Sequence, residues 1–321
     1  MPSTHHSRPA CPTSASRTHS EPRLQLASIP RNRAQSSTQD RTLRAIHHAI
    51  HRSTPTHDPR THLHLAHHAL TTTFATTSSS HQQELHLIHW AKENHLHIPH
   101  DQFPAACQPP SHLEDSFMEH HVWPHHSGHR ILKLTHAGHF GLWPSAHKNG
   151  AGWDLHTRHT TPLRYLTRLL AANTHLGDDF VLHAIITDSH CRPQILTSQP
   201  HYPGPTPGDI IDAAPPSQQS RIRHQQHTLI RQALAARGFH PTHHSPSTFY
   251  RPADNLALFD AHFQNLIWHP SPHSPRTLIP FDVLPLHPHG KLRENLSLSL
   301  LPIPSPLSKT HLPLLTSSLI P

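Results

Sequence analysis

Three oxygen-bearing side chains in the C-terminal third of the chain have the types and spacing of a metal site with a nearby base. Asp260 and Asn265 lie in the stretch LFDAHFQNLIW, and Asp282 follows inside the apolar run LIPFDVL. Mg²⁺ takes hard oxygen ligands and keeps several waters, so one carboxylate and one amide are a usual protein contribution. A further carboxylate nearby can accept the proton of an attacking hydroxyl group.

The apolar surroundings of the two aspartates set them apart from ordinary surface acids. The chain holds only 19 Asp and Glu residues among 321. A buried carboxylate is costly unless a metal, a hydrogen-bond donor or a proton compensates it, so we expect a partner group beside each. Asp282 is the strongest of the set because FDVLPL offers it no turn context. The Asp-x4-Asn spacing alone is common. Two alternatives therefore remain, in which Asp260 is an ordinary turn or cap residue and Asn265 is an ordinary turn amide.

Lys133 is the candidate cation. It is one of five lysines in a chain that otherwise prefers arginine, and it lies between Leu132 and Leu134 in RILKLT. Because successive side chains of a strand point to opposite faces, Lys133 is expected on the face opposite to both leucines. The alternative is a lysine on the solvent face of a hairpin.

The composition separates a folded region from its flanks. The chain contains 35 Pro and 43 His, its hydrophobic content is 34%, and its N-terminal part is mostly Ser, Thr, His, Arg and Pro. Such a segment buries too little apolar surface to offset its ordering entropy, which predicts a disordered tail over 1–60, most clearly over about the first forty residues. All ten glycines lie between Gly128 and Gly290, where the turns of a compact fold are expected.

Charge, cysteine and histidine usage argue against several classes of protein. The formal net charge is +7, but the positive residues are scattered, so nucleic-acid binding is not indicated. Three widely separated cysteines suggest neither a disulfide framework nor a zinc site. We find no apolar leader or membrane-spanning stretch and expect a cytoplasmic protein without a membrane partner. A His-rich basic protein that binds metal or nucleic acid is the weakest alternative.

Hydrophobic periodicity predicts three helices after residue 80. The clearest covers 161–176, with Thr161 as N-cap, Pro162 at the first helical position and Gly177 at the end. A second is expected over 82–94, with an apolar stripe of Leu85, Ile88 and Ala91 that Leu87 and Trp90 widen, and a third near 218–237.

The expected strands lie between and after these helices. A β-hairpin is predicted over 119–135, followed by strands over 180–186 and 194–197. The segment 198–208 is predicted to be a linker without regular structure, because it is rich in Pro and Gly. A strand–loop–strand unit then leads to Asp282, and after about residue 288 the chain turns Pro-, Ser- and Leu-rich and loses clear periodicity.

In this order, the parts of 119–288 resemble the kinase-like domain found in polyvalent proteins of phages and conjugative mobile elements, a distant relative of protein kinases. The resemblance covers about half of the chain, and the order and spacing of several stretches carry it. These stretches are EHHVW, RILKLTHAGHFG, PLRYLTRLLAANTHLGDDF, ILTSQP, GFH, FDAHFQNLI and IPFDV.

The resemblance implies an α+β, two-lobed protein-kinase-like fold over 110–290 with a reduced large lobe. The small lobe would cover about 110–198 and the large lobe about 199–290. A helical N-terminal extension is expected over 61–109, and a Pro/Ser/Leu-rich tail over 291–321.

The resemblance also implies a role for each candidate residue. Lys133 would hold the α- and β-phosphates of ATP, Asp260 would be the catalytic acid–base residue, and Asn265 and Asp282 would bind Mg²⁺. Gln199 would lie at the hinge beside adenine. The implied function is Mg²⁺-ATP-dependent phosphoryl transfer to a hydroxyl, with Ser or Thr of a protein substrate as the expected acceptor.

The chain also departs from the kinase pattern. No Gly-rich loop precedes Lys133, and the helix over 161–176 contains no acid to pair with it. Glu119, which matches the family without an assigned role, or Asp178 or Asp179 would have to substitute. Because of these departures, the alternative of a pseudokinase that binds nucleotide or a partner without turnover remains. A small-molecule acceptor, as in aminoglycoside-type phosphotransferases, is also open.

Overall fold

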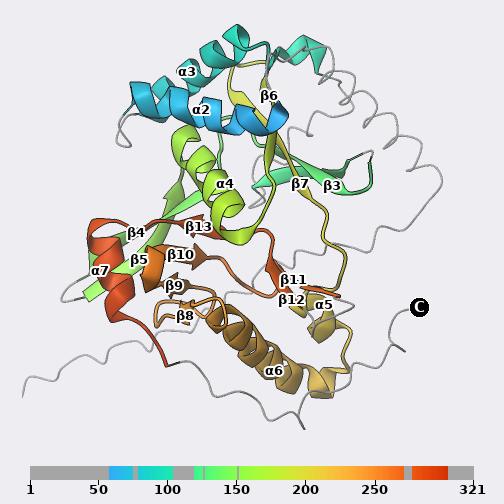
Figure 1. The fold of residues 1–321 in the computed structure, drawn as a ribbon, viewed down its shortest axis with the longest axis vertical. Helices are drawn as coiled ribbons and strands as arrows, with labels where there is room; N and C mark the ends of the chain where they lie inside the picture. Colours follow the sequence, from blue (N-terminus) through green and yellow to red (C-terminus); the bar gives the residue numbers. More distant parts are fainter. Residues whose placement is uncertain are drawn as a thin grey trace, which may run out of the picture.

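The structure, a computed structural model, describes residues 58–74, 79–103, 119–125, 127–149, 152–270 and 277–302. Within these ranges the chain forms an α+β fold with six α-helices and several sheets, none of which closes into a barrel (Figure 1). The predicted α+β class is confirmed at this level. Most of the two predicted tails, residues 1–57 and 303–321, lies outside the described ranges.

A five-stranded sheet carries Lys133 and Gln199. Its strand order is β1-β6-β7-β3-β2, and only the β1–β6 pair is parallel. β2 and β3 form the predicted hairpin, with Gly128 at a left-handed φ of 71° in its turn. The strands predicted near 180–186 and 194–197 are β6 and β7. The bounds are His97–Ile98 (β1), His120–Pro124 (β2), Arg130–Thr135 (β3), Val181–Thr187 (β6) and Pro193–Pro200 (β7).

Three helices pack against this sheet and share a core with it. They are α2 (Pro59–Thr73), α3 (Ser80–Glu93) and α4 (Pro162–Leu176), grouped in the upper half of Figure 1. Leu63 of α2, Leu87 of α3, Leu166 of α4 and Ile185 of β6 are all fully buried in one cluster. The described part of 61–109, predicted as an extension, is therefore built into the fold.

The buried face of α3 differs from the predicted stripe. Leu85, expected inside it, is 55% exposed, whereas Leu87, Ile88, Trp90 and Ala91 are buried. The helix contacts α2, α4 and β6 together. It also contacts β1 and β7, so these five neighbours set its buried face, which is turned away from Leu85.

α4 begins and ends where the sequence predicts. Pro162 is its first residue, and Gly177 closes it in the left-handed conformation at a φ of 78°. Thr161 is the N-cap residue, as predicted, but its side chain makes no capping hydrogen bond. Instead, Gln83 of α3 accepts a 3.1 Å hydrogen bond from the backbone N–H of Leu163. A contact between helices thus satisfies the end of α4.

The segment 198–208, predicted to lack regular structure, is regular at both ends. β7 continues through Pro200, which pairs with Arg130 of β3. The next helix, α5 (Pro207–Asp212), starts with a capping box in which Thr206 and Asp209 each accept the other's backbone N–H. Proline is tolerated at a strand end and at a first helical position, so the prolines here delimit elements without excluding them.

The remaining elements lie in the lower half of Figure 1. α6 (Pro216–Ala235) is the helix predicted near 218–237. A four-stranded sheet has the order β13-β10-β9-β8. β11 (Leu266–His269) and β12 (Thr277–Pro280) form a separate hairpin, tied to α6 by a 2.9 Å hydrogen bond from the Trp268 indole to Gln226. The bounds in the four-stranded sheet are His240–Pro241 (β8), Phe249–Arg251 (β9), Leu256–Phe259 (β10) and Leu284–Leu286 (β13).

A further hairpin and the last described helix also have no counterpart in the prediction. β4 (Leu142–Asn149) and β5 (Gly152–His159) form a hairpin whose polar, His- and Thr-containing sequence gives no clear alternation. α7 (Gly290–Leu298) lies where the C-terminal tail was expected to begin at 291. That boundary is wrong, because Leu292 and Leu296, one helical turn apart, are buried in a cluster with β13.

Candidate functional site

Lys133 lies in the middle of β3 and is almost fully enclosed. Its backbone is paired with Val122 of β2 and Thr197 of β7, and the residue is 3% exposed. The ammonium Nζ donates a 2.8 Å hydrogen bond to Oδ1 of Asp282. The alternative of a lysine on a solvent-facing hairpin is therefore wrong. A buried ammonium requires such a partner, since removing an unpaired charge from water is costly.

Asp282 lies between β12 and β13 and has one face in the interior and one toward solvent. Its side chain is 44% exposed although Oδ1 is bound to Lys133. Burial alone would raise the pKa of this carboxyl, but neighbouring groups, above all the positive charge of Lys133, together outweigh burial and lower the pKa. Asp282 is thus held as a carboxylate, the form that a cation needs.

Asp260 and Asn265 lie on the loop between β10 and β11 and contact each other. Asp260 follows β10 directly at a left-handed φ of 59°, a conformation uncommon outside glycine. The Asn265 amide Nδ2 donates to both the carbonyl and Oδ2 of Asp260, each at 3.0 Å. His262 lies 3.4 Å from the other carboxylate oxygen. Burial, together with the charge of Asp282, raises the pKa of Asp260, and His262 and Asn265 oppose this shift.

The β11–β12 hairpin joins these two parts of the site and belongs to the strand–loop–strand unit predicted to lead to Asp282. Leu266 pairs with Pro280, which sets the residues before β11 next to those after β12. The N–H of Phe281 donates 3.1 Å to the carbonyl of Asn265. The residue next to Asp282 is therefore bound directly to Asn265.

Gln199 is a strand residue of β7 and is fully buried. Its backbone is paired with Ile131, and its Nε2 donates 3.0 Å to the carbonyl of Phe281. Phe281 is thus held from two sides, by Gln199 and by Asn265. The structure gives the Gln199 side chain a bond to the segment before Asp282, a contact that the sequence did not predict.

Glu119 pairs with a residue that sequence reasoning missed. Its carboxylate forms an ion pair with the guanidinium of Arg168 in α4. Gly141, at a φ of 82°, makes room for it, because a Cβ on Gly141 would lie 2.1 Å from Glu119 Oε1. A signal for Arg168 is present in the sequence. It lies three residues after Tyr165 and four before Ala172, so helical spacing places its charge on the apolar stripe that α4 buries.

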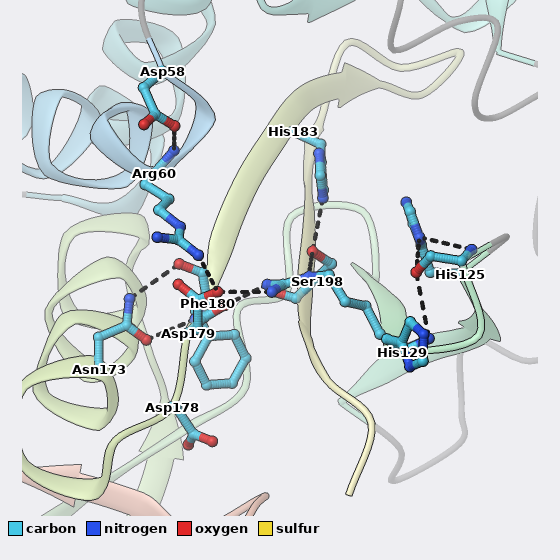
Figure 2. Close-up of polar contacts among 12 residues, drawn as sticks. Asp58, Arg60, His125, His129, Asn173, Asp178, Asp179, Phe180, His183 and Ser198 are labelled. Atoms are coloured by element: carbon cyan, nitrogen blue, oxygen red, sulfur yellow. Dashed lines mark hydrogen bonds and ion pairs between the residues drawn. The ribbon is translucent and has the colours of Figure 1, made fainter.

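The other acids considered as partners of Lys133 bind elsewhere. Asp178 accepts a 2.8 Å hydrogen bond from the Tyr202 hydroxyl. Asp179 binds Arg130 at 2.8 Å and Arg60 of α2 at 3.3 Å, and Figure 2 shows it among these polar contacts. Neither aspartate contacts Lys133, which pairs with Asp282 instead.

Phe180 follows these aspartates and borders the site. Figure 2 shows the Asn173 side chain bound to its backbone on both sides, accepting from the N–H at 2.7 Å and donating to the carbonyl at 3.0 Å. The ring of Phe180 lies 5.9 Å from Lys133 Nζ, measured to the ring centroid. The C-terminal end of α4 therefore positions the aromatic wall beside the lysine.

A small pocket lies where these elements meet. Burial, helped by the Lys133 charge, lowers the pKa of His120 to about 3, so this histidine is neutral and contacts the Tyr165 hydroxyl at 2.9 Å. Burial lowers the pKa of Arg168 to about 10, which leaves it positively charged at neutral pH. The pocket thus contains two cations and one carboxylate. Its lining is His120, Lys133, Arg168, Leu169, Ala172, Phe180, Asp282 and Val283.

Comparison of the chain with protein-family models, curated proteins and solved structures gave no match. In the part of the chain that the structure describes, no helix is long and apolar enough to cross a membrane.

Proposed function

We propose that the protein is a divergent protein-kinase-like phosphotransferase that transfers a phosphoryl group from Mg²⁺-ATP to a hydroxyl, with Ser or Thr of a protein as the acceptor. One observation carries the proposal. Lys133 and Asp282 lie 149 residues apart in the chain, yet they meet at 2.8 Å in one pocket. Asn265 is bound to the residue preceding Asp282 and also to Asp260. A cation for phosphates and three oxygen groups for a metal and a base therefore adjoin one another.

The arrangement of elements supports a two-lobed reading. The five-stranded sheet with α4 would form the smaller lobe, and α5, α6 and the four-stranded sheet would form the larger one. The connection from β7 to α5 would be the hinge, with Gln199 at its start. The pocket is lined from β2, β3 and α4 on one side and by Asp282 and Val283 on the other, as a nucleotide site between lobes requires.

The side chains fit Mg²⁺-ATP. When bound, the metal neutralises charge on the phosphates, and catalysis is otherwise mainly positioning and charge stabilisation. Lys133 would bind phosphate oxygens, and Asp282 with the Asn265 amide oxygen would hold the metal. Asn265 donates through Nδ2 to Asp260, and no described residue donates to its Oδ1. Asp260, 49% exposed at its side chain, would orient the acceptor hydroxyl and accept its proton.

Incubation with γ-labelled ATP tests the proposal. Labelling of the protein itself, or of a mixed protein acceptor, is expected with Mg²⁺ and is expected to stop with EDTA. Labelling of Ser or Thr in the acceptor would identify the substrate class, whereas transfer only to small hydroxyl compounds would correct it. Transfer that persists in EDTA would contradict the metal site.

A nucleotide-binding protein without turnover is the second candidate, and one observation favours it. Lys133 is bound to Asp282, the proposed metal ligand, and not to an acid of α4. If this pair persists when nucleotide binds, Oδ1 of Asp282 stays bound to Lys133, and the lysine charge weakens the attraction of the carboxylate for a metal. Stabilisation by ATP in a thermal melt, with no label transferred, would support this candidate over the first.

A further inference from the structure

Arg168 is the one charged group lining the pocket that the proposed function leaves without a role. It is 5% exposed and lies on the buried face of α4. One nitrogen of its guanidinium, Nη2, is paired with Glu119. The other terminal nitrogen, Nη1, is buried and has no hydrogen-bond partner among the described residues. An enclosed, charged donor without a partner is rare in folded proteins and calls for a ligand.

The position of Arg168 identifies the kind of ligand. It lines the same pocket as Lys133 and Asp282. The negative charges of both Asp282 and Asp260 act on it and keep its pKa higher than burial alone would. The guanidinium therefore lies near the metal-binding and base residues of the proposed site, where the phosphates of a nucleotide would be bound.

The guanidinium is also held in place. Glu119 pairs with it on one side, and Gly141 leaves the space in which the Glu119 carboxylate sits. The Tyr165 ring, 5.0 Å from the guanidinium carbon, supports it from another. A fixed, planar fork with one free arm is suited to a phosphate oxygen.

We propose that Arg168 is a second phosphate-binding cation, which acts beside Lys133 on the polyphosphate of the nucleotide, and that Glu119 is its positioning residue. This inference rests on the proposed function of the site. It assigns to α4 a cation where protein kinases carry the acid that pairs with the lysine. Glu119 is paired with Arg168, so Asp282 is the acid that pairs with Lys133.

The test compares binding of Mg²⁺-ATP and of adenosine by calorimetry. Arg168→Gln is expected to weaken Mg²⁺-ATP about tenfold or more, because a hydrogen bond to a charged group is lost. Adenosine affinity should stay within about twofold, since adenosine carries no phosphate. Arg60→Gln, which removes the same charge from an exposed position of α2, is the matched control and should bind both as the wild type does.

Glu119→Gln keeps Arg168 but weakens the ion pair that positions it, and it provides the test if Arg168→Gln fails to fold. It is expected to weaken Mg²⁺-ATP more than adenosine, a difference that a merely structural role would not produce. Arg168→Lys should fall between wild type and Arg168→Gln, because it keeps the charge and loses the fork.

The outcomes separate the two proposals. If wild type binds Mg²⁺-ATP and Arg168→Gln or Glu119→Gln binds it equally well, the role of Arg168 is overturned and the proposed function stands. If wild type binds neither Mg²⁺-ATP nor adenosine, the proposed function fails. In that case the binding of inorganic tripolyphosphate is measured. If wild type binds it and the folded Arg168→Gln variant does not, Arg168 belongs to an anion site. If wild type does not bind it, the role of Arg168 is overturned.

Discussion

Lys133 in β3 donates a 2.8 Å hydrogen bond to Asp282, which lies in the connection between β12 and β13, strands of two other sheets. The lysine is buried and the aspartate is half-exposed. The pair therefore joins an interior cation to a carboxylate that solvent and ligands can reach.

Lys133→Met is expected to abolish most nucleotide binding. It removes the cation proposed to hold the phosphates and keeps a side chain of similar length. We expect affinity for Mg²⁺-ATP to fall about tenfold or more, since a charge-assisted contact is lost. The measurement is the thermal shift with Mg²⁺-ATP, with Lys291→Met on the surface of α7 as the control. An unchanged shift in Lys133→Met would remove the lysine from the site.

Asp282→Asn should separate binding from transfer. The amide can still accept a hydrogen bond from Lys133 but is a weaker metal ligand than a carboxylate. Label transfer from ATP is expected to fall about a hundredfold or more. Asp101→Asn, at an exposed position, serves as the control. Transfer at the wild-type rate in Asp282→Asn would rule out the metal role.

Gly141→Ala tests how Glu119 is held. Both Gly141 and Gly177 have a left-handed φ, 82° and 78° respectively. A Cβ added at Gly141 would clash with Glu119, whereas a Cβ added at Gly177 would have no atom within 4 Å. Each substitution should cost about 1 kcal/mol through its φ. Gly141→Ala should cost about 1–3 kcal/mol more, because it displaces the glutamate.

Urea denaturation measures that difference, and calorimetry shows whether Mg²⁺-ATP binding falls in Gly141→Ala alone. Equal losses of stability and unchanged binding in both variants would mean that Glu119 moves aside without consequence.

Asp178 should make stability depend on pH. Burial raises its pKa to about 7 from the ordinary 3.8, and the hydrogen bond from Tyr202 only partly opposes this. The folded protein therefore holds the proton to higher pH than the unfolded chain does. Its favourable contribution is complete below about pH 4 and is lost as pH rises through about 7.

Asp178→Asn is neutral at every pH and should lack this loss. The difference in unfolding free energy between variant and wild type is expected to move in favour of the variant by a few kcal/mol from about pH 4 to about pH 8. Taking the difference cancels the titration of the histidines that both proteins share. Tyr202→Phe removes the bond that opposes the shift and should move the loss to higher pH. Parallel pH curves for wild type and Asp178→Asn would show that Asp178 is ionised in the folded state.

α7 should be needed for stability. Leu296 is fully buried and Leu298, in the same helix, is 80% exposed. Leu296→Ala is expected to cost about 2–5 kcal/mol through lost burial and a cavity, and Leu298→Ala less than about 0.5 kcal/mol. Urea denaturation of both variants measures this. Equal, small effects would mean that the fold ends before α7, as the sequence suggested.

Local signals in the sequence accounted for much of the secondary structure. Pro162 and Gly177 delimit α4 through the conformations that these residues favour, and the hairpin of β2 and β3 follows from its turn at Gly128. Where neighbours override local preference, prediction failed. The N-cap residue Thr161 makes no capping hydrogen bond, and Gln83 binds the start of α4 in its place. α3 turns Leu85 outward because five other elements pack on its remaining faces.

For the site, the sequence by itself determined which residues were worth considering: two aspartates in apolar surroundings, an amide at a fixed spacing and an isolated lysine. Their partners were decided only by the tertiary structure. Lys133 meets Asp282 across 149 residues, and Glu119 meets Arg168 because Gly141 leaves room. The physical reason is that a buried charge must find an opposite charge nearby in space, and no pattern along the chain shows which distant segment the fold brings there.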